Sequence, residues 1–190
     1  QIETYKPQII HIHNLHYGIG PLLIRKLKNR RYPLVMTLHN FRLICPSGTL
    51  FAHGSLFTSS ITENFPWTAV KEKVLDNSLL KTFITAYTYW AHRQAGTWNA
   101  IDQYFTFSDF SKSIFTASKL NIPAHKLTIK PNFVPVPQVS KATFADYFVY
   151  IGRLSVEKGI IPLLESISQT NYTLKIYGTG PQEEEVKEFA

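Results

Sequence analysis

The sequence predicts an α/β fold in which helices flank parallel sheets of the Rossmann-like kind. Three observations support this prediction. Short β-branched runs alternate with segments of helical periodicity along most of the chain. Two apolar runs near the C-terminal end each finish in a glycine-containing turn, and the charge is divided unevenly between two parts of the chain. Strand, helix and strand within about 30 residues form a βαβ unit, whose strands are parallel.

The first such unit lies at the start of the chain. Residues 8–13 form a short β-branched run that predicts a buried strand, and residues 34–38 predict a second one. Between them, leucines recur at helical spacing and Pro33 follows the last of them, which predicts a helix that ends before the proline.

Further elements continue the alternation. The predicted strands are 103–107, 127–130, 147–151 and 172–177, and the predicted helices are 110–120, 160–168 and a segment from 182 onward. This repetition is typical of doubly wound α/β proteins.

Two segments interrupt the alternation. Residues 40–66 form a long excursion of the kind that often serves as a lid or an acceptor-binding loop. Residues 133–145 contain two prolines and no clear period, which predicts a linker. We therefore expect one domain in residues 1–134, a linker over 135–145 and a second domain in residues 146–190.

Charge supports the same division. Residues 1–145 hold 16 Lys and Arg against 6 Asp and Glu, whereas residues 146–190 hold 4 against 7. A basic unit suits phosphates, anionic lipid head groups or nucleic acid. Apart from a cluster in residues 25–31, which we expect on the solvated face of a helix, the basic residues are dispersed. This dispersal argues against a nucleic-acid-binding protein.

A long helix is predicted over residues 78–97, where apolar and aromatic side chains recur at steps of three and four residues. We expect this stripe to pack in the core. The alternative is a face that touches a membrane or a lipid-linked acceptor.

The only cysteine, Cys45, has no partner for an internal disulfide, which favours a reducing compartment. No apolar run approaches the ~18 residues of a membrane span. We expect a cytoplasmic location, with a peripheral contact at the inner membrane face left open.

A turn with phosphate-binding features follows the strand at 147–151. Gly152 and Arg153 come first, Ser155 stands where a helix N-cap is expected, and Lys158 lies three residues later. The N-terminus of a helix offers unpaired N–H groups and a partial positive charge to phosphate, and glycine lets the backbone come close. The two cationic side chains add formal charge. The alternative is a surface turn with a solvated Arg and Lys.

A second glycine turn, with Gly178 and Gly180, follows the next predicted strand. In open α/β folds, ligands bind outside the carboxyl ends of the strands. Two such turns on consecutive parallel strands therefore predict a site for a nucleotide or phosphate.

These segments resemble retaining glycosyltransferases of family 4, also called group 1, which have the two-domain GT-B fold. The resemblance runs in order through residues 10–14, 36–48, 107–112, 130–134, 152–159 and 177–181. It implies that both domains are incomplete: residues 1–134 would be the later part of the acceptor domain, and residues 146–190 the beginning of the nucleotide-sugar domain. The glycine-rich loop of the first domain would precede Gln1, and the glutamate pair that binds the donor would follow Ala190.

The resemblance also implies roles for single residues. Arg153 and Lys158 would neutralise the donor diphosphate as it departs. His39 would face the transferred sugar, and its alternative is a half-buried structural histidine. Ser108 would lie in a donor-binding segment, and its alternative is an ordinary N-cap.

His11 and His13 share one face of a predicted strand, where a metal site is conceivable. The family generally works without a metal, so we expect these histidines to be structural and no metal or separate cofactor to be bound.

The function that the resemblance implies is retaining transfer of a sugar, of the hexosyltransferase type, from a nucleotide-diphosphate sugar to a glycan or lipid-linked acceptor in polysaccharide or glycoconjugate biosynthesis. We expect these residues alone to be inactive, because the glutamate pair is expected outside them. The alternative is a non-catalytic α/β module that binds a nucleotide or phosphate.

Overall fold

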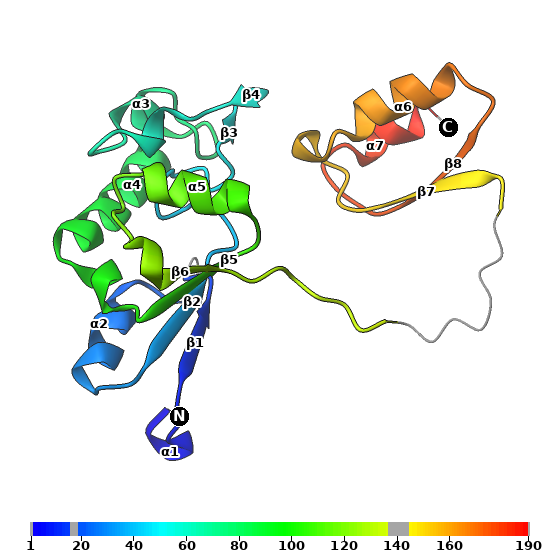
Figure 1. The fold of residues 1–190 in the computed structure, drawn as a ribbon. Coiled ribbons are helices and arrows are strands. Elements are labelled where there is room, and N and C mark those ends of the chain that lie inside the picture. The colour runs from blue at the N-terminus through cyan, green and yellow to red at the C-terminus, as the bar shows by residue number, and fades with distance from the viewer. Residues whose placement is uncertain (1, 16–18, 137–144, 190) are drawn as a thin grey trace. The chain divides into compact units, whose positions relative to one another are not determined.

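The computed structural model describes residues 2–15, 19–136 and 145–189. The chain divides into two units, Gln1–Val134 and Pro135–Ala190, and each is described by itself (Figure 1). This division lies where the predicted linker begins, and residues 137–144 of that linker are outside the described residues. No helix in the described part of the chain is long and apolar enough to cross a membrane.

The first unit is built on a four-stranded parallel sheet in the order β1-β2-β5-β6. Its strands are β1 (Ile10–His13), β2 (Leu34–Thr37), β5 (Gln103–Thr106) and β6 (Leu127–Ile129). Its α-helices are α1 (Ile2–Tyr5), α2 (Leu22–Asn29), α3 (Trp67–Lys71), α4 (Leu79–Gln94) and α5 (Asp109–Ala117). The shorter elements are the hairpin of β3 (Phe51–Ala52) and β4 (Ser55–Leu56) and the 3-10 turns η1 (Ser59–Ile61), η2 (Thr97–Ala100) and η3 (Ala124–Lys126). The predicted α/β class with a parallel sheet is confirmed.

One face of this sheet carries the core. Ile12, Met36, Tyr104 and Leu127 occupy strand positions that point into the main hydrophobic cluster, together with residues of α2 and α5. The strands pair in chain order, and a crossover between parallel strands is almost always right-handed, so successive helices fall on the same face. Side chains of the opposite face, such as that of His11, are exposed.

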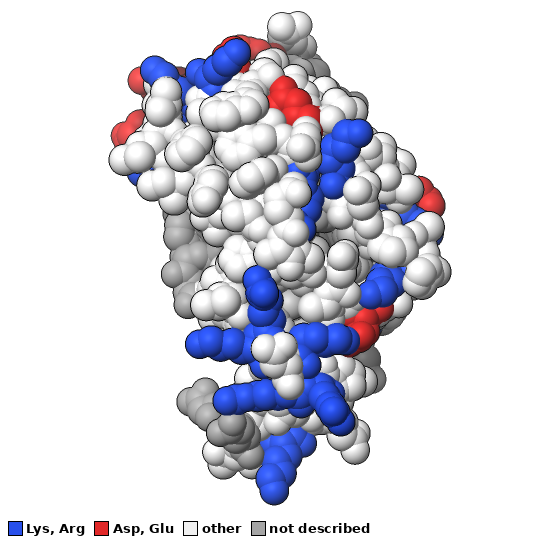
Figure 2. Space-filling model, turned by 90° about the vertical axis from the view of Figure 1, so that its left-hand side faces the viewer, with Lys and Arg blue, Asp and Glu red and all other residues white. Residues whose placement is uncertain are grey.

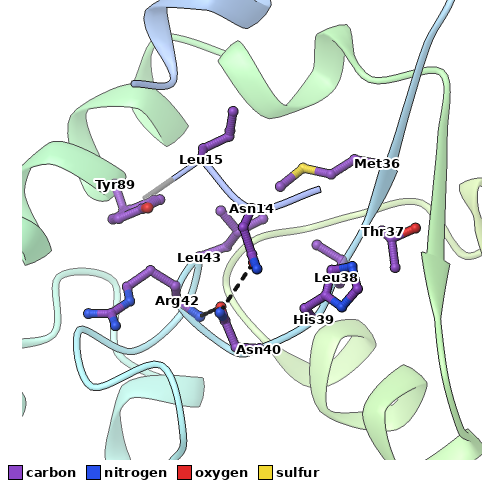
Figure 3. Close-up of a pocket in the computed structure, with 10 residues that line it drawn as sticks. All are labelled: Asn14, Leu15, Met36, Thr37, Leu38, His39, Asn40, Arg42, Leu43 and Tyr89. Carbon is purple, nitrogen blue, oxygen red and sulfur yellow. Dashed lines mark hydrogen bonds between the residues drawn. The ribbon is translucent and has the colours of Figure 1, made fainter. Parts of the chain in front are cut away.

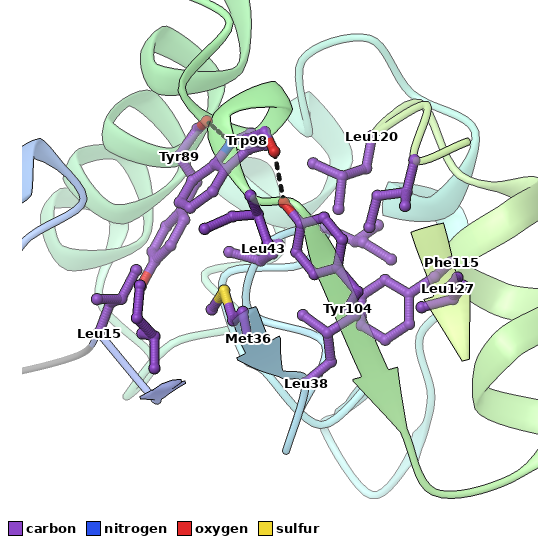
Figure 4. Close-up of a cluster of buried hydrophobic side chains, with 14 of the residues drawn as sticks. Leu15, Met36, Leu38, Leu43, Tyr89, Trp98, Tyr104, Phe115, Leu120 and Leu127 are labelled. Atoms are coloured by element: carbon purple, nitrogen blue, oxygen red, sulfur yellow. Dashed lines mark hydrogen bonds between the residues drawn. The ribbon is translucent and has the colours of Figure 1, made fainter. Parts of the chain in front are cut away.

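The centre of the core is a group of large rings (Figure 4). The Tyr104 ring is 1% exposed, and its hydroxyl donates a hydrogen bond of 2.7 Å to the carbonyl oxygen of Trp98. Burial raises the pKa of this hydroxyl, so it stays a donor. The Trp98 ring stacks on that of Tyr89, with centroids 5.9 Å apart. These contacts fix η2 and α4 against the sheet.

The excursion over residues 40–66 is anchored rather than free. It supplies buried side chains to the main cluster, namely Leu43, Ile44, Cys45, Leu50 and Ile61. These positions are fixed against the core, because their apolar side chains gain more from burial than from solvent exposure.

The predicted long helix begins where the sequence indicates but ends early. Ser78 is the N-cap of α4, and its hydroxyl accepts a hydrogen bond of 3.3 Å from the N–H of Lys81. The helix stops at Gln94, because Gly96 adopts the left-handed conformation with φ of 68°.

The second unit is smaller. Strands β7 (Tyr147–Ile151) and β8 (Thr173–Tyr177) form a parallel pair, with the 3-10 turn η4 (Val156–Lys158) and helices α6 (Ile160–Ser168) and α7 (Glu183–Lys187). Its core consists of Leu154, Ile160, Leu164 and Val186. The predicted helix over 160–168 agrees with α6.

Asp102 connects the start of β5 to two other elements of the first unit. Its Oδ1 accepts a hydrogen bond of 2.8 Å from Lys28 Nζ on α2, and its Oδ2 accepts one of 2.8 Å from the N–H of Leu34 on β2. Partial burial acts to raise the pKa of the carboxyl group, but these bonds and the charges of Lys28 and Lys126 outweigh it and lower the pKa. The carboxylate therefore stabilises the folded state.

We predict that Asp102→Asn lowers the free energy of unfolding by about 1 kcal/mol at pH 7, since the lost charged hydrogen bonds are half exposed. The folded pKa is depressed, so this contribution is present above about pH 4 and disappears as the pH falls through the folded pKa. Urea unfolding at pH 7 and pH 3 measures it. Asp76→Asn is the matched control, because Asp76 pairs with Lys81 on the surface; an equal loss there would contradict the prediction.

Candidate functional site

The predicted site residues lie in two places. His39 and Ser108 belong to the first unit, and five others belong to the second. These five are Gly152, Arg153, Lys158, Gly178 and Gly180. Within each unit, the residues lie at or beyond the carboxyl ends of parallel strands, where ligands bind in open α/β folds.

In the second unit, the pairing of β7 with β8 continues into the turns that follow them. The N–H of Gly152 donates to the carbonyl oxygen of Tyr177, and the N–H of Leu154 donates to that of Thr179, each over 3.0 Å. These two N–H groups hold the turns together. The Gly152 amide is therefore engaged and is not a free donor for an anion.

The glycines of the second turn allow this close approach. A Cβ atom at Gly178 would overlap the carbonyl oxygen of Gly152, and one at Gly180 would overlap that of Leu154. A side chain at either position would force the two turns apart. Contact between the turns thus explains both residues without any ligand.

A shallow, open hollow lies at this end of the strand pair. Its lining consists of Ile151, Gly152, Arg153, Tyr177, Gly178, Thr179 and Gly180. The structure therefore brings together four of the five predicted residues, and Arg153 is the cationic one among them. Lys158 lies outside the lining.

The charges of Arg153 and Lys158 both act on the carboxylate of Glu157. The pKa of Glu157 is lowered by the Ser155 hydroxyl first and by its own backbone N–H second. Slight burial opposes this, and the charges of Arg153 and Lys158 lower the pKa further. Glu157 therefore adds a negative charge to the same turn as the two cations, which the sequence analysis did not anticipate.

The helix start also differs from the prediction. Ser155 makes no side-chain cap and precedes η4, while α6 begins at Ile160 after Gly159, whose φ is 66°. A left-handed residue interrupts helical hydrogen bonding, so the helix cannot extend back to Ser155. The helical element that starts after Ser155 is therefore the 3-10 turn η4, and the α-helix expected there begins only at Ile160.

In the first unit, histidines from neighbouring strands meet on the exposed face of the sheet. The Nδ1 atom of His13 lies 2.8 Å from Nε2 of His39, and Nε2 of His11 lies 2.8 Å from the Thr37 hydroxyl. The rings of His11 and His13 are 4.0 Å apart, and that of His39 lies 5.1 Å from Phe107. The cluster follows from the register, because His13 pairs with Thr37 two residues before His39.

Two members of this histidine cluster (His11, His13 and His39) have lowered pKa values, namely His11 and His39. Burial is the largest cause that lowers the pKa of His39, and the charge of His13 is the second. Burial also lowers the pKa of His11, followed by the charges of His13, Lys130 and His39. Because one imidazole must donate to the other, a neutral His13–His39 pair has coupled tautomers.

His39 also lines a small pocket at the end of β2 (Figure 3). There the amide of Asn40 donates a hydrogen bond of 3.4 Å to Asn14 Oδ1, and its own Oδ1 accepts one of 3.0 Å from the N–H of Arg42. The remaining lining residues are Leu15, Met36, Thr37, Leu38, Leu43 and Tyr89. Polar groups from two strand ends thus surround an apolar floor.

Ser108 has a structural role in its helix. Its hydroxyl accepts a hydrogen bond of 3.2 Å from the N–H of Ser111 and is the N-cap of α5. The N-cap alternative is therefore confirmed, and a donor-binding role would be additional to it.

Sequence reasoning did not single out Asn14, Asn40 and Arg42 as site residues, although each follows a predicted strand closely. Their position shortly after a predicted strand was the signal in the sequence that could have identified them. Within the described residues, no group of three or more His, Cys, Asp or Glu side chains has the arrangement of a metal site.

Comparison with protein-family models, with curated proteins and with solved structures gives no match to this chain.

We predict that Gly178→Ala destabilises the second unit by about 1–3 kcal/mol, because the added Cβ must push the backbone away from Gly152. Hydrogen exchange of the β7 and β8 amides should quicken. Gly20→Ala is the control, since no atom lies within 4 Å of a Cβ there. Unchanged protection of β7 and β8 in Gly178→Ala would show that the turns do not depend on this contact.

We also predict that His13→Asn raises the pKa of His39 and of His11 toward the ordinary value, since it removes a positive neighbour. Burial is the larger cause, so both values should stay lowered. NMR titration of the imidazole signals measures the shift. His53→Asn is the matched control, because His53 contacts the Glu72 carbonyl group instead. A His39 pKa that does not move in His13→Asn would contradict the cluster.

Proposed function

We propose that this chain is part of a retaining glycosyltransferase of GT-B architecture that uses a nucleotide-diphosphate sugar. In this proposal the second unit binds the diphosphate, and the acceptor is a glycan or a lipid-linked glycan. The fold supports the proposal at the coarse level, because a parallel sheet flanked by helices is compatible with a Rossmann-like domain.

The observation that carries the proposal is the hollow at the carboxyl ends of β7 and β8. Two turns converge there with little side-chain bulk, and the exposed guanidinium group of Arg153 belongs to the lining. A guanidinium group offers a planar fork of donors that matches two phosphate oxygens at once. Lys158 adds a mobile charge from the same turn, as its effect on Glu157 indicates.

These groups suit the departure of a diphosphate. In retaining transfer with front-side departure, the bond from the anomeric carbon to the diphosphate oxygen breaks while negative charge grows on the leaving group. Cationic side chains that meet this charge stabilise the transition state more than the ground state. We assign this role to Arg153 and Lys158. His39 would contact a hydroxyl group of the sugar through a ring nitrogen.

A non-catalytic module that binds a nucleotide or phosphate is the second candidate. One observation favours it: the lining of the hollow includes no carboxylate that could hold the hydroxyl groups of a sugar or ribose. Such a module would bind the diphosphate through the same arginine and transfer nothing.

We predict that Arg153→Ala weakens the binding of uridine or guanosine diphosphate about tenfold to a hundredfold, because it removes charged hydrogen bonds to phosphate. Lys158→Ala should weaken it less, since Lys158 lies outside the lining. Calorimetric titration measures both. Lys187→Ala is the control, because Lys187 is paired with Glu183 and Glu184 on α7.

Sugar transfer from radiolabelled donors separates the two candidates. Loss of about 10²-fold or more in turnover for Arg153→Ala supports the transferase. Diphosphate binding that depends on Arg153, without any transfer in the full-length protein, would favour the module. Equal affinity in Arg153→Ala and the unchanged chain would exclude both.

A further inference from the structure

Helix α4 exposes most of its large apolar side chains. Its buried residues are Thr82, Ala86 and Tyr89, of which only Tyr89 is large. By contrast, Leu80 is 65% exposed, Ile84 54% and Tyr87 53%. An amphipathic helix that only packs on a core has the opposite arrangement, with large apolar residues inside. The exposed stripe therefore is not explained by packing within this unit.

Aromatic rings extend this apolar surface onto the segment before α3. Phe65 lies 4.5 Å from Trp67 and 6.1 Å from Phe83, measured between ring centroids. Phe83 lies 6.1 Å from Tyr87, which lies 5.9 Å from Trp90. The side chain of Trp67 is 56% exposed. Large exposed apolar patches on a folded protein mark interaction sites, and Trp and Tyr are the residues that suit the boundary between lipid and water.

Basic side chains lie next to this surface. Helix α2 and the two residues after it carry Arg25, Lys26, Lys28, Arg30 and Arg31. The Lys and Arg side chains gather in the lower part of one face, and a largely uncharged surface lies above them (Figure 2). Arg25 is close enough to α4 that its charge lowers the pKa of His92, after the larger effect of burial. Helix α2 also packs against η2, which directly follows α4.

Acidic residues are missing from the same stretches of sequence. No Asp or Glu occurs between Glu3 and Glu63, or between Asp76 and Asp102. Helices α2 and α4 therefore contain basic but no acidic residues, although Lys28 pairs with Asp102 and Lys81 pairs with Asp76, both outside these helices. We call the exposed side chains of these two helices, together with Trp67, the α2–α4 face.

We propose that the α2–α4 face binds the surface of an anionic lipid bilayer. The apolar and aromatic side chains of α4 enter the interface, and the Lys and Arg side chains of α2 meet the anionic head groups. The helix lies along the surface, in agreement with the finding that no described helix could cross a membrane. This proposal is independent of sugar transfer, because it uses none of the residues assigned to the diphosphate or the sugar.

A lipid surface fits this chemistry better than nucleic acid does. Single-stranded nucleic acid needs rings on which bases stack, interleaved with cations along the backbone path. On this face, aliphatic side chains such as Leu79, Leu80 and Ile84 lie among the rings, and most cations sit on the neighbouring helix. Aliphatic chains gain free energy in hydrocarbon but do not stack on bases.

Flotation of the 190-residue chain with phosphatidylcholine vesicles, with and without about a third phosphatidylglycerol, tests the proposal. We expect binding to the anionic vesicles alone, weakened in 0.5 M NaCl because salt screens the attraction. Lys26→Glu should weaken binding about tenfold or more, since each cation near an anionic surface contributes roughly a fivefold change in affinity and reversal counts twice. Leu80→Ser should weaken it by about tenfold through the lost insertion.

The matched controls carry the same kinds of substitution at positions outside the α2–α4 face. Lys119→Glu reverses one charge at an exposed position after α5, and Leu56→Ser alters a leucine on β4 that is 81% exposed. Both should bind vesicles like the unchanged chain. Circular dichroism of all four variants should match that of the unchanged chain, because each altered side chain is exposed.

Three results would overturn the proposal. The first is equal or absent binding to the two kinds of vesicle. The second is a loss in the Lys119 and Leu56 controls as large as that in Lys26→Glu and Leu80→Ser. The third is tight binding to oligo(dT) without binding to vesicles, which would assign the face to nucleic acid instead.

Discussion

Parallel pairing of strands in chain order is the constraint on which the first unit depends. Because β1, β2, β5 and β6 follow one another across the sheet, right-handed crossovers place the helices on one face. The same parallel direction collects all carboxyl strand ends at one edge, where His39 and Ser108 lie. The opposite face is left to polar and aromatic side chains, and the register brings His13 against His39 there.

The second unit depends on a different constraint, which is the contact between two backbone turns. Gly178 and Gly180 allow the turns after β7 and β8 to touch, and the touching carbonyl and N–H groups satisfy each other. The glycines that suggested a phosphate-binding turn are thus required by the fold itself. For a ligand, the turns offer mainly the charge of Arg153, and the same turn also carries Lys158 and Glu157.

Local sequence patterns were sufficient for the elements and for much of the candidate sites. The strand at 147–151, the helix over 160–168 and the cap at Ser78 agree with the structure, because they depend on neighbours within a few residues. The convergence of the Gly152 and Gly178 turns also followed from sequence, since two consecutive parallel strands must end at the same edge. Ser155 was misplaced because a left-handed Gly159 interrupts the helix, and glycine permits this conformation without requiring it.

By itself, the sequence determined the α/β class, the order of the six strands of the two parallel sheets along the chain, and the cationic character of the first 145 residues. Only the tertiary structure decided which nitrogen atoms of the histidine cluster meet, which backbone N–H groups are bonded between the turns, and which large apolar side chains of α4 are exposed. The physical reason is the separation along the chain over which each kind of interaction acts. Periodicity and capping act between residues close in the chain, whereas register, side-chain contact and burial depend on segments that only folding brings together.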